Sequence, residues 1–319
     1  MSIKPKKIVI IGAGHVGSHV GYTLASQGIC DEIVFIDTDQ KKAIAQVKDI
    51  EDAIVYMPYH TNIKLGDYTD IDDAEIIVIS AGPLPTTNSG MTRMDTLGMT
   101  IDAIKPIVEN IKKSKFEGII VSISNPADVI AHYIQQKTGI SPKRVISTST
   151  TLDTARLKCA ISRTLNISTK SICAYVLGEH GESQMVPWSC VSIYGKSLFS
   201  LMKEFPETYG KIDLNKISKD AKLEGWDVFL GKSCTEFGIG ISGAEIIKTI
   251  LSDEKKVSMI SVLLNGEYGQ NDVYASVPVI LGKNGVEKII ELPLNEKEIE
   301  EFKNSCETMK KNFEIALNM

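Results

Sequence analysis

KIVII at residues 7–11, followed directly by GAGHVG at residues 12–17, is the stretch that decides the fold. The apolar run predicts a buried strand, and helical periodicity follows the glycines as far as about Gln27. The first glycine permits a tight turn, the second lets the backbone approach a diphosphate, and the third lets the helix pack on the strand. The helix N-terminus offers unpaired N–H groups, which bind phosphates. This stretch therefore predicts a strand–turn–helix unit that binds a phosphate-bearing ligand.

An acidic residue at the end of the next strand indicates which phosphate-bearing ligand the turn would bind. Asp37 directly follows the apolar run Ile33–Ile36, 20 residues after Gly17. An acid at this place accepts hydrogen bonds from the ribose hydroxyls of a dinucleotide. Because no arginine follows to hold a 2′-phosphate, the pattern favours NAD over NADP, although Lys41 and Lys42 lie close by. The structural alternative is a glycine turn beside a solvated acid.

Short β-branched runs and helical segments alternate through the first half of the chain. The expected strands continue with Ile76–Ile79, Gly118–Ile123 and Arg144–Ser147, and the expected helices cover Asp39–Tyr56, Thr92–Lys113 and Ala127–Lys137. Continuous apolar strands between helices indicate a parallel sheet covered on both faces. We therefore predict an α/β protein whose residues 1–150 form a doubly wound parallel Rossmann sheet that binds NAD.

The pattern changes after about Thr150. Helices are expected at about Leu152–Leu165, Ile212–Phe229, Thr235–Leu251 and Asn295–Leu317, with strand-like runs at Ser171–Leu177, Val257–Leu264 and Val273–Leu281. The last two runs look like antiparallel strands. Residues 151–319 are therefore expected to form an α+β catalytic and substrate domain with antiparallel strands.

The composition excludes several classes of function. The net charge is −5, and nucleic-acid binding needs clustered positive charge instead. No stretch approaches the roughly 18 apolar residues of a membrane helix, and no signal peptide is recognisable. The six cysteines show no CxxC spacing, so we expect reduced thiols, a cytoplasmic location and no metal site.

Two segments of the second half carry candidate chemistry: LDTAR at residues 152–156 and GEHGES at residues 178–183. Asp153 and Arg156 share one helix face at this spacing. A carboxylate that accepts the Nδ1–H of an imidazole fixes the tautomer of the ring, and an arginine can clamp a substrate carboxylate. From spacing alone, a structural ion pair is an equal alternative. The glycines around His180 favour an irregular loop over a core position.

In combination, these motifs resemble the L-lactate/L-malate dehydrogenase family over nearly the full chain. GAGHVG, Asp37, the Ser124-Asn125-Pro126 turn, LDTAR and GEHGES occur in the family's order. The resemblance implies NAD-dependent oxidation of L-2-hydroxy acids. It implies that His180 transfers the proton, that Asp153 is its partner and that Arg156 binds the substrate carboxylate.

The resemblance also assigns further residues. Arg93 would polarise the substrate carbonyl under a lid at about residues 83–94, and Asn125, Thr235 and Thr87 would contact substrate. The expected cofactor residues are Gly12, Gly14, Val16, Gly17, Asp37, Lys42, Tyr68, Gly82 and Asn125. A homotetramer or homodimer acting in glycolysis is implied as well.

The lid segment departs from the family and bears on substrate choice. Malate enzymes are expected to carry an arginine about six residues before the lid arginine, where this chain has Thr87. No Lys or Arg occurs between Ser80 and Thr92. A second substrate carboxylate would be unpaired there, so malate is disfavoured. L-Lactate is the first expectation for the substrate.

The sequence is also consistent with two other predictions of function. Gly231–Gly238 is similar to bacterial L-2-hydroxyisocaproate dehydrogenases, which makes a broader aliphatic 2-oxo acid range the second expectation. A catalytically silent dinucleotide-binding protein is the alternative from another class. At the positions that match the sugar-bisphosphate site of activated bacterial enzymes, the chain carries Lys158 and Cys173, which puts that activation in doubt.

Overall fold

In the computed structural model, which describes residues 4–83 and 96–319, nine strands form one large sheet. Its order is β12-β11-β10-β6-β5-β4-β1-β2-β3. The six parallel strands are β1 (Lys7–Ile11), β2 (Glu32–Ile36), β3 (Asn62–Leu65), β4 (Ile76–Ile79), β5 (Ile119–Ser122) and β6 (Val145–Ser147). The order reverses beside β1, as in a doubly wound sheet, and the predicted fold class is confirmed.

The antiparallel strands extend this same sheet. They are β10 (Lys256–Asn265), β11 (Asn271–Gly282) and β12 (Gly285–Ile289). β10 joins the parallel part antiparallel to β6, with Ser261 opposite Ser147. The predicted antiparallel strands are therefore present, and they are continuous with the Rossmann sheet. The division into residues 1–150 and 151–319 stays a prediction.

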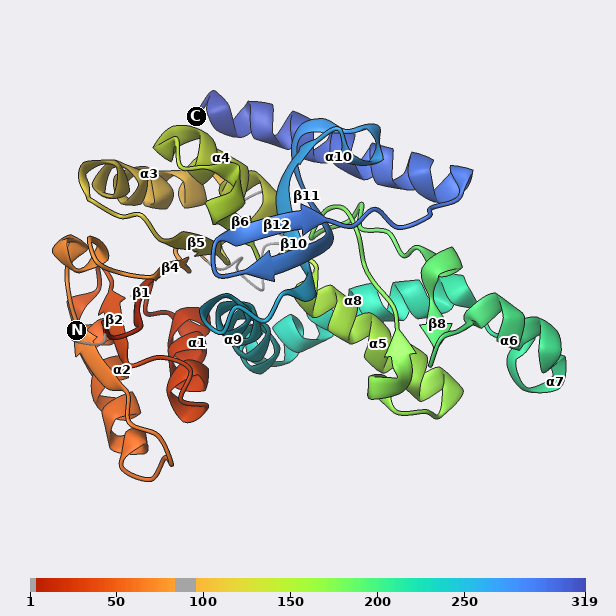
Figure 1. Ribbon diagram of the computed structural model, residues 1–319, viewed down its shortest axis with the longest axis horizontal. Coiled ribbons are helices and arrows are strands. Elements are labelled where there is room, and N and C mark those ends of the chain that lie inside the picture. The colour runs from red at the N-terminus through yellow and green to blue at the C-terminus, as the bar shows by residue number, and fades with distance from the viewer. Residues whose placement is uncertain (1–3, 84–95) are drawn as a thin grey trace.

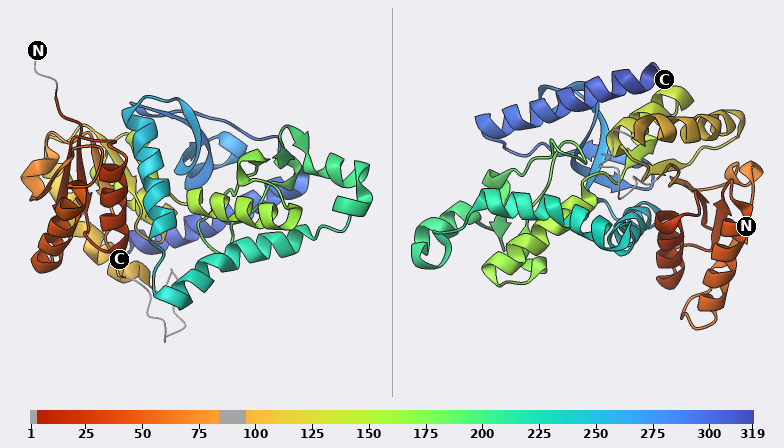
Figure 2. Two further views of the ribbon diagram at one scale, coloured as in Figure 1. Left: turned by 90° about the horizontal axis from the view of Figure 1, so that it is seen from below. Right: turned by 180° about the vertical axis from the view of Figure 1, so that it is seen from behind.

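Helices cover both faces of the sheet (Figures 1 and 2). One face packs against α1 (His15–Ser26), α2 (Gln40–Ile54) and α9 (Phe237–Leu251). The other packs against α3 (Leu97–Lys113), α4 (Ala127–Thr138) and the end of α10 (Glu296–Leu317). Alternate residues of β1 divide between the two layers, with Ile8 and Ile10 on one side and Val9 and Ile11 on the other.

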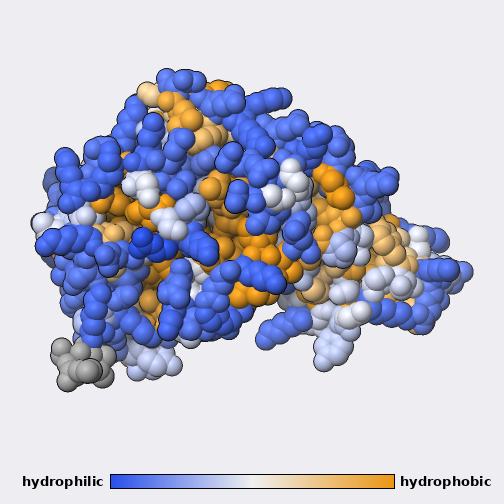
Figure 3. All heavy atoms as spheres, turned by 45° about the horizontal axis from the view of Figure 1, so that its top comes forward, coloured by the Kyte–Doolittle hydropathy of each residue, from blue (hydrophilic) through white to orange (hydrophobic). Residues whose placement is uncertain are grey.

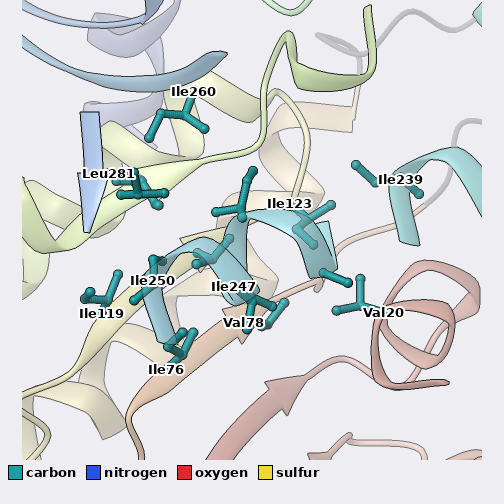
Figure 4. Close-up of a cluster of buried hydrophobic side chains, with 14 of the residues drawn as sticks. Val20, Ile76, Val78, Ile119, Ile123, Ile239, Ile247, Ile250, Ile260 and Leu281 are labelled. Atoms are coloured by element: carbon teal, nitrogen blue, oxygen red, sulfur yellow. The ribbon is translucent and has the colours of Figure 1, made fainter. Parts of the chain in front are cut away.

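The core between α9 and the sheet connects distant parts of the chain. Ile247 and Ile250 of α9 lie beside Ile76 and Val78 of β4 (Figure 4). All four side chains are at most 3% exposed. Burying each such side chain contributes about 1.5–3 kcal/mol, so α9 is held firmly on the Rossmann sheet.

The remaining elements form a lobe beyond the large sheet. They are α5 (Thr151–Leu165), α6 (Leu198–Glu204), α7 (Pro206–Tyr209), α8 (Leu214–Lys232) and a small sheet of β7 (Ile172–Cys173), β8 (Ser192–Ile193) and β9 (Lys196–Ser197). Only two residues of the strand-like run Ser171–Leu177 are strand. The rest of the run leads to the loop that carries His180.

Two findings bear on the composition arguments. No helix in the described part of the chain is both long enough and apolar enough to cross a membrane. All six cysteines are free thiols, and Cys30, Cys234 and Cys306 are buried.

Candidate active site

A cavity of about 430 Å³ opens at the carboxyl ends of the central parallel strands. It is lined by segments that follow β1, β4, β5 and β6 and by residues of α5, α8 and α9. Ligands of open α/β sheets bind at this edge, where the strand order reverses. Of the expected site residues, Gly14, Val16, Lys42, Gly82, Asn125, Arg156, His180 and Thr235 line the cavity.

The glycine turn has the conformation that its sequence predicts. Gly12 has a φ of +105°, and a Cβ there would lie 2.2 Å from the carbonyl oxygen of Ser80. A Cβ on Gly17 would lie 1.9 Å from the carbonyl oxygen of Gly12. Both positions therefore require glycine for close backbone packing. Gly14, the N-cap residue of α1, has no side chain to bond the N–H groups of the first helical turn.

Asp37 fixes the turn from the neighbouring strand end. Its Oδ2 accepts a hydrogen bond from the N–H of Ala13 at 2.7 Å, and its Oδ1 accepts one from the N–H of Asp39 at 2.9 Å. A carboxylate oxygen accepts two hydrogen bonds, so acceptor capacity remains for ribose hydroxyls. Lys42 Nζ lies 3.6 Å from the place that a Cβ on Gly14 would take, beside the open helix end.

These features fit a dinucleotide. Among the described residues outside its own helix, a Cβ on Gly14 would meet only Lys42 Nζ within 4 Å, so the backbone is open to the cavity at the point where a diphosphate needs close approach. The helix N-terminus and Lys42 supply positive charge there.

Tyr68 lies apart from this arrangement. It opens the short helix Tyr68–Ile71 and packs against the core cluster that contains Val9 and Ile77. Burial raises the pKa of its phenol. Tyr68 is not among the cavity-lining residues, and its expected cofactor contact stays a prediction.

A buried carboxylate joins the histidine and the arginine. Asp153 Oδ2 lies 2.5 Å from His180 Nδ1, and Asp153 Oδ1 accepts a hydrogen bond from Arg156 Nη1 at 3.0 Å. Asp153 is 4% exposed and Arg156 8%. With Nδ1 occupied, His180 presents its Nε2 to a ligand.

Arg156 is held from the opposite side by α8. A Cβ on Gly225 would lie 3.0 Å from Arg156 Nη1 and 3.1 Å from its Cζ. Gly225 thus lets α8 pack directly on the guanidinium group. Its neighbours Trp226 and Phe229 also line the cavity, so the arginine lies at an apolar wall, where a bound carboxylate is shielded from water.

Sequence reasoning missed Asp128, in the first turn of α4. Its carboxylate accepts hydrogen bonds from the backbone N–H of His180 at 2.9 Å and from the hydroxyl of Ser149 at 2.7 Å. Burial raises the pKa of Asp128, and these hydrogen bonds oppose the rise. A signal was present, because residues 127–134 of α4 are all buried and an acid in a buried run needs partners.

The loop that carries His180 is anchored on both sides. Gly178 pairs with Ser276 of β11 through two backbone hydrogen bonds of 3.0 Å. Gly178 has a φ of +84°, and a Cβ there would lie 2.4 Å from Ser305 Oγ of α10. Ser305 Oγ also accepts the N–H of Glu179 at 2.9 Å. The position of His180 is therefore set by β11, α4 and α10 together.

Thr87, Arg93 and most of the expected lid lie outside the described residues. Thr235 lies in the connection between α8 and α9 and lines the cavity. Its expected contact with substrate stays a prediction.

The chain matches two family models that together span nearly all of it. Residues 6–147 match the NAD-binding domain of lactate/malate dehydrogenases, and residues 150–319 match their alpha/beta C-terminal domain. An L-lactate dehydrogenase of Fusobacterium nucleatum subsp. nucleatum is 39% identical over 98% of both chains. L-lactate dehydrogenase 3 of Bacillus thuringiensis subsp. konkukian is 38% identical over 96% of both.

Solved structures of lactate and malate dehydrogenases are similar to this chain over nearly its full length. The minor L-lactate dehydrogenase from Enterococcus mundtii, in a ligand-bound form, has a TM-score of 0.92 and 33% identity over 97% of this chain and 98% of its own. Malate dehydrogenase from Cryptosporidium parvum also has a TM-score of 0.92, with 28% identity over 99% of this chain and 100% of its own.

Gly225→Ala is expected to displace the Arg156 guanidinium. In NADH-linked reduction of pyruvate, we expect a higher KM for pyruvate and a kcat/KM lower by about tenfold or more, because small misplacements of a binding group are costly. Gly231→Ala, on the same helix, is the matched control, since a Cβ there meets nothing within 4 Å. Equal KM values for the two variants would contradict this role of Gly225.

Asp128→Ala is expected to leave the N–H of His180 and the hydroxyl of Ser149 without their acceptor. Each unsatisfied buried donor costs about 1–3 kcal/mol, so the free energy of unfolding and kcat should both fall. Asp128→Asn keeps an amide oxygen for the N–H and an amide donor for the hydroxyl, so it should restore most of both. The measurements are denaturant unfolding and steady-state kinetics. If Asp128→Asn and Asp128→Ala reduce kcat equally while they differ in stability, Asp128 does not position His180 through these hydrogen bonds.

Proposed function

This chain belongs to the lactate/malate dehydrogenase family, and from that premise we propose that it interconverts L-lactate and pyruvate with NAD as the cofactor. The observation that carries the proposal is the Asp153 carboxylate, which contacts His180 and Arg156 at one wall of the cavity. A silent dinucleotide-binding protein has no need of a buried acid that orients both an imidazole and a guanidinium group.

The proton is handled by His180. In lactate oxidation, the hydroxyl proton passes to Nε2 while the C2–O bond becomes a carbonyl. Asp153 accepts the Nδ1–H and stabilises the imidazolium that forms. In the reverse direction, the same imidazolium returns the proton to the carbonyl oxygen. NAD, when bound, supplies the acceptor for the hydride that leaves C2 with its electron pair.

The substrate is oriented by its carboxylate. Arg156 uses Nη1 for Asp153, and its other N–H groups are available for two parallel hydrogen bonds to a carboxylate. The apolar residues Leu152, Phe229 and Ile239 line the same cavity, and they exclude water and strengthen this ion pair. Arg93 is proposed to polarise the carbonyl from the lid.

NAD is proposed over NADP because of Asp37. A carboxylate that accepts ribose hydroxyls would repel a 2′-phosphate. Lys42 is near Gly14, at the helix end, which suits the diphosphate.

A monocarboxylate is proposed because the lid offers no cation for a second carboxylate. The stretch between Ser80 and Thr92 has no Lys or Arg. The names of the curated relatives support L-lactate over a broader substrate range. Within Gly231–Gly238, the segment behind the broader range, Gly238 leaves room beside the cavity-lining Leu152, since a Cβ there would lie 2.7 Å from the tip of that side chain. One methyl group changes discrimination by only about 1–3 kcal/mol.

The expected order of kcat/KM is pyruvate first, 2-ketoisocaproate second and oxaloacetate last. NADH oxidation, followed by its absorbance, measures all three. His180→Asn should lower kcat by at least about 100-fold, because the proton donor is lost while NADH binding persists. Faster turnover of oxaloacetate would contradict the interpretation of the lid. If none of the three substrates is turned over, the proposal that this chain is a 2-hydroxy acid dehydrogenase is wrong.

We also propose a homotetramer or homodimer, which acts in the cytosol as part of glycolysis. Large hydrophobic side chains are exposed on α1, α2 and α9 on one side of the sheet, in the turn after α2, and on α8: Tyr22, Ile44, Val55, Tyr56, Leu223, Leu230, Phe237 and Ile241. Figure 3 shows another face, on which hydrophobic residues reach the surface in patches between hydrophilic side chains. Exposed apolar groups of this size favour a protein interface.

Light scattering on the purified protein should give two or four times the chain mass of 34.9 kDa. Tyr56 is 92% exposed, and Tyr56→Glu should lower that mass by placing a charge in the interface. A wild-type mass equal to that of one chain would contradict the proposal.

A further inference from the structure

Three metal-binding residue types meet at the edge of the cavity. His15, Cys234 and Glu236 each bring one donor atom, and these atoms all lie within 4.8 Å of one another. His15 is the first residue of α1, directly after the glycine turn. Cys234 and Glu236 lie in the connection between α8 and α9, on either side of Thr235. His15 and Cys234 also line the cavity.

The carboxylate is already arranged as a ligand. Glu236 Oε1 lies 2.7 Å from His15 Nδ1, while Oε2 lies 2.5 Å from Lys232 Nζ. An ion bound through Oε1 would leave the lysine in place on Oε2.

The thiol of Cys234 and the imidazole of His15 supply the other two donor atoms. The Cys234 residue is 3% exposed, and its sulfur lies within 4.8 Å of the donor atoms of His15 and Glu236. A bound cation would replace the proton of the thiol, and that proton leaves to solvent. The His15 side chain is 57% exposed and is able to move toward an ion.

We propose that His15, Cys234 and Glu236 form a site for one divalent cation of the zinc class. Nitrogen, sulfur and carboxylate donors are the set that zinc prefers, whereas magnesium and calcium take oxygen donors. Tetrahedral zinc places its donors roughly 3.5 Å apart, so small side-chain rotations close the present arrangement around an ion. The fourth position remains for water.

An ion at this place would link α1 to the connection between α8 and α9. His15 follows the glycine turn, and Thr235 lies between the other two ligands. His15 and Cys234 line the cavity, so an ion with its bound water would occupy space there, and we expect the ion and a dinucleotide each to weaken the binding of the other. This coupling rests on the proposed function, whereas the ion site itself does not.

The ion site is tested on the full-length protein freed of metal and kept reduced with a phosphine. Zn²⁺ is titrated in competition with a chromophoric chelator, and Co²⁺ is followed by its absorption. We expect one ion per chain and a thiolate-to-cobalt band. Cys234→Ser should abolish the band, and Cys234→Ser, His15→Asn and Glu236→Gln should each weaken Zn²⁺ binding by at least about tenfold.

Two variants serve as matched controls. Cys173 is an exposed thiol, and His19 is a partly buried imidazole one turn further along α1. Cys173→Ser and His19→Asn should keep the stoichiometry, the affinity and the cobalt band. Absence of binding in the wild type, or equal loss in Cys173→Ser, would overturn the site.

The coupling is tested by NADH binding, measured by fluorescence with and without Zn²⁺. Saturating Zn²⁺ should raise the Kd for NADH at least about fivefold in the wild type and leave it unchanged in Cys234→Ser. An unchanged or lower Kd in the wild type would overturn the competition. Turnover of pyruvate by the metal-free protein tests the proposed function alone, so failure of either idea is recognised separately.

Discussion

The Asp153 carboxylate is the interaction on which the rest of the site depends. It is nearly inaccessible to water, and its two oxygens contact different partners, His180 and Arg156. A lone charge at this depth would cost several kcal/mol, so the acid and its two partners are stable only as a group. The orientation of the imidazole and that of the guanidinium group are therefore coupled. Proton transfer and carboxylate binding are two uses of one buried charge.

The position of Asp153 follows from the start of α5. It lies in the first turn of that helix, where the helix dipole favours a negative charge. The same turn holds the chain that leads to His180. Thr150 Oγ1 donates to the carbonyl oxygen of Val176 at 2.6 Å, and the N–H of Val176 donates to Thr154 Oγ1 at 3.0 Å. Two threonine hydroxyls thus satisfy backbone groups of Val176 that a neighbouring strand would otherwise bind. They keep the segment that leads to His180 beside Asp153.

Local signals account for what the sequence could predict. The glycine turn, Asp37 and the sheet on either side of them depend on contacts within about 70 residues, and each leaves a pattern in the sequence. β3 (Asn62–Leu65) was missed because an edge strand of four residues is half exposed and carries little apolar signal. The roles of Asp128 and Gly225 were missed for a different reason. Asp128 contacts His180, and Gly225 contacts Arg156, across separations that no periodicity records.

The continuity of the sheet explains why the glycine turn and the His180 loop stay at a fixed distance from each other. The glycine turn follows β1, and the His180 loop is paired to β11 through Gly178. Both strands belong to the same nine-stranded sheet, joined where Ser261 of β10 faces Ser147 of β6. A hinge between two separate sheets would let the proton-transfer group and the dinucleotide turn drift apart, and misplacement by about 1 Å is enough to lower a rate substantially. A shared sheet resists such drift, because moving one loop relative to the other would break strand pairing or shift buried side chains on both faces. The adjustable parts of the cavity are therefore the segments outside the sheet. Among the described ones, α8 contacts Arg156 through Gly225, and its connection to α9 contacts His15 through Glu236.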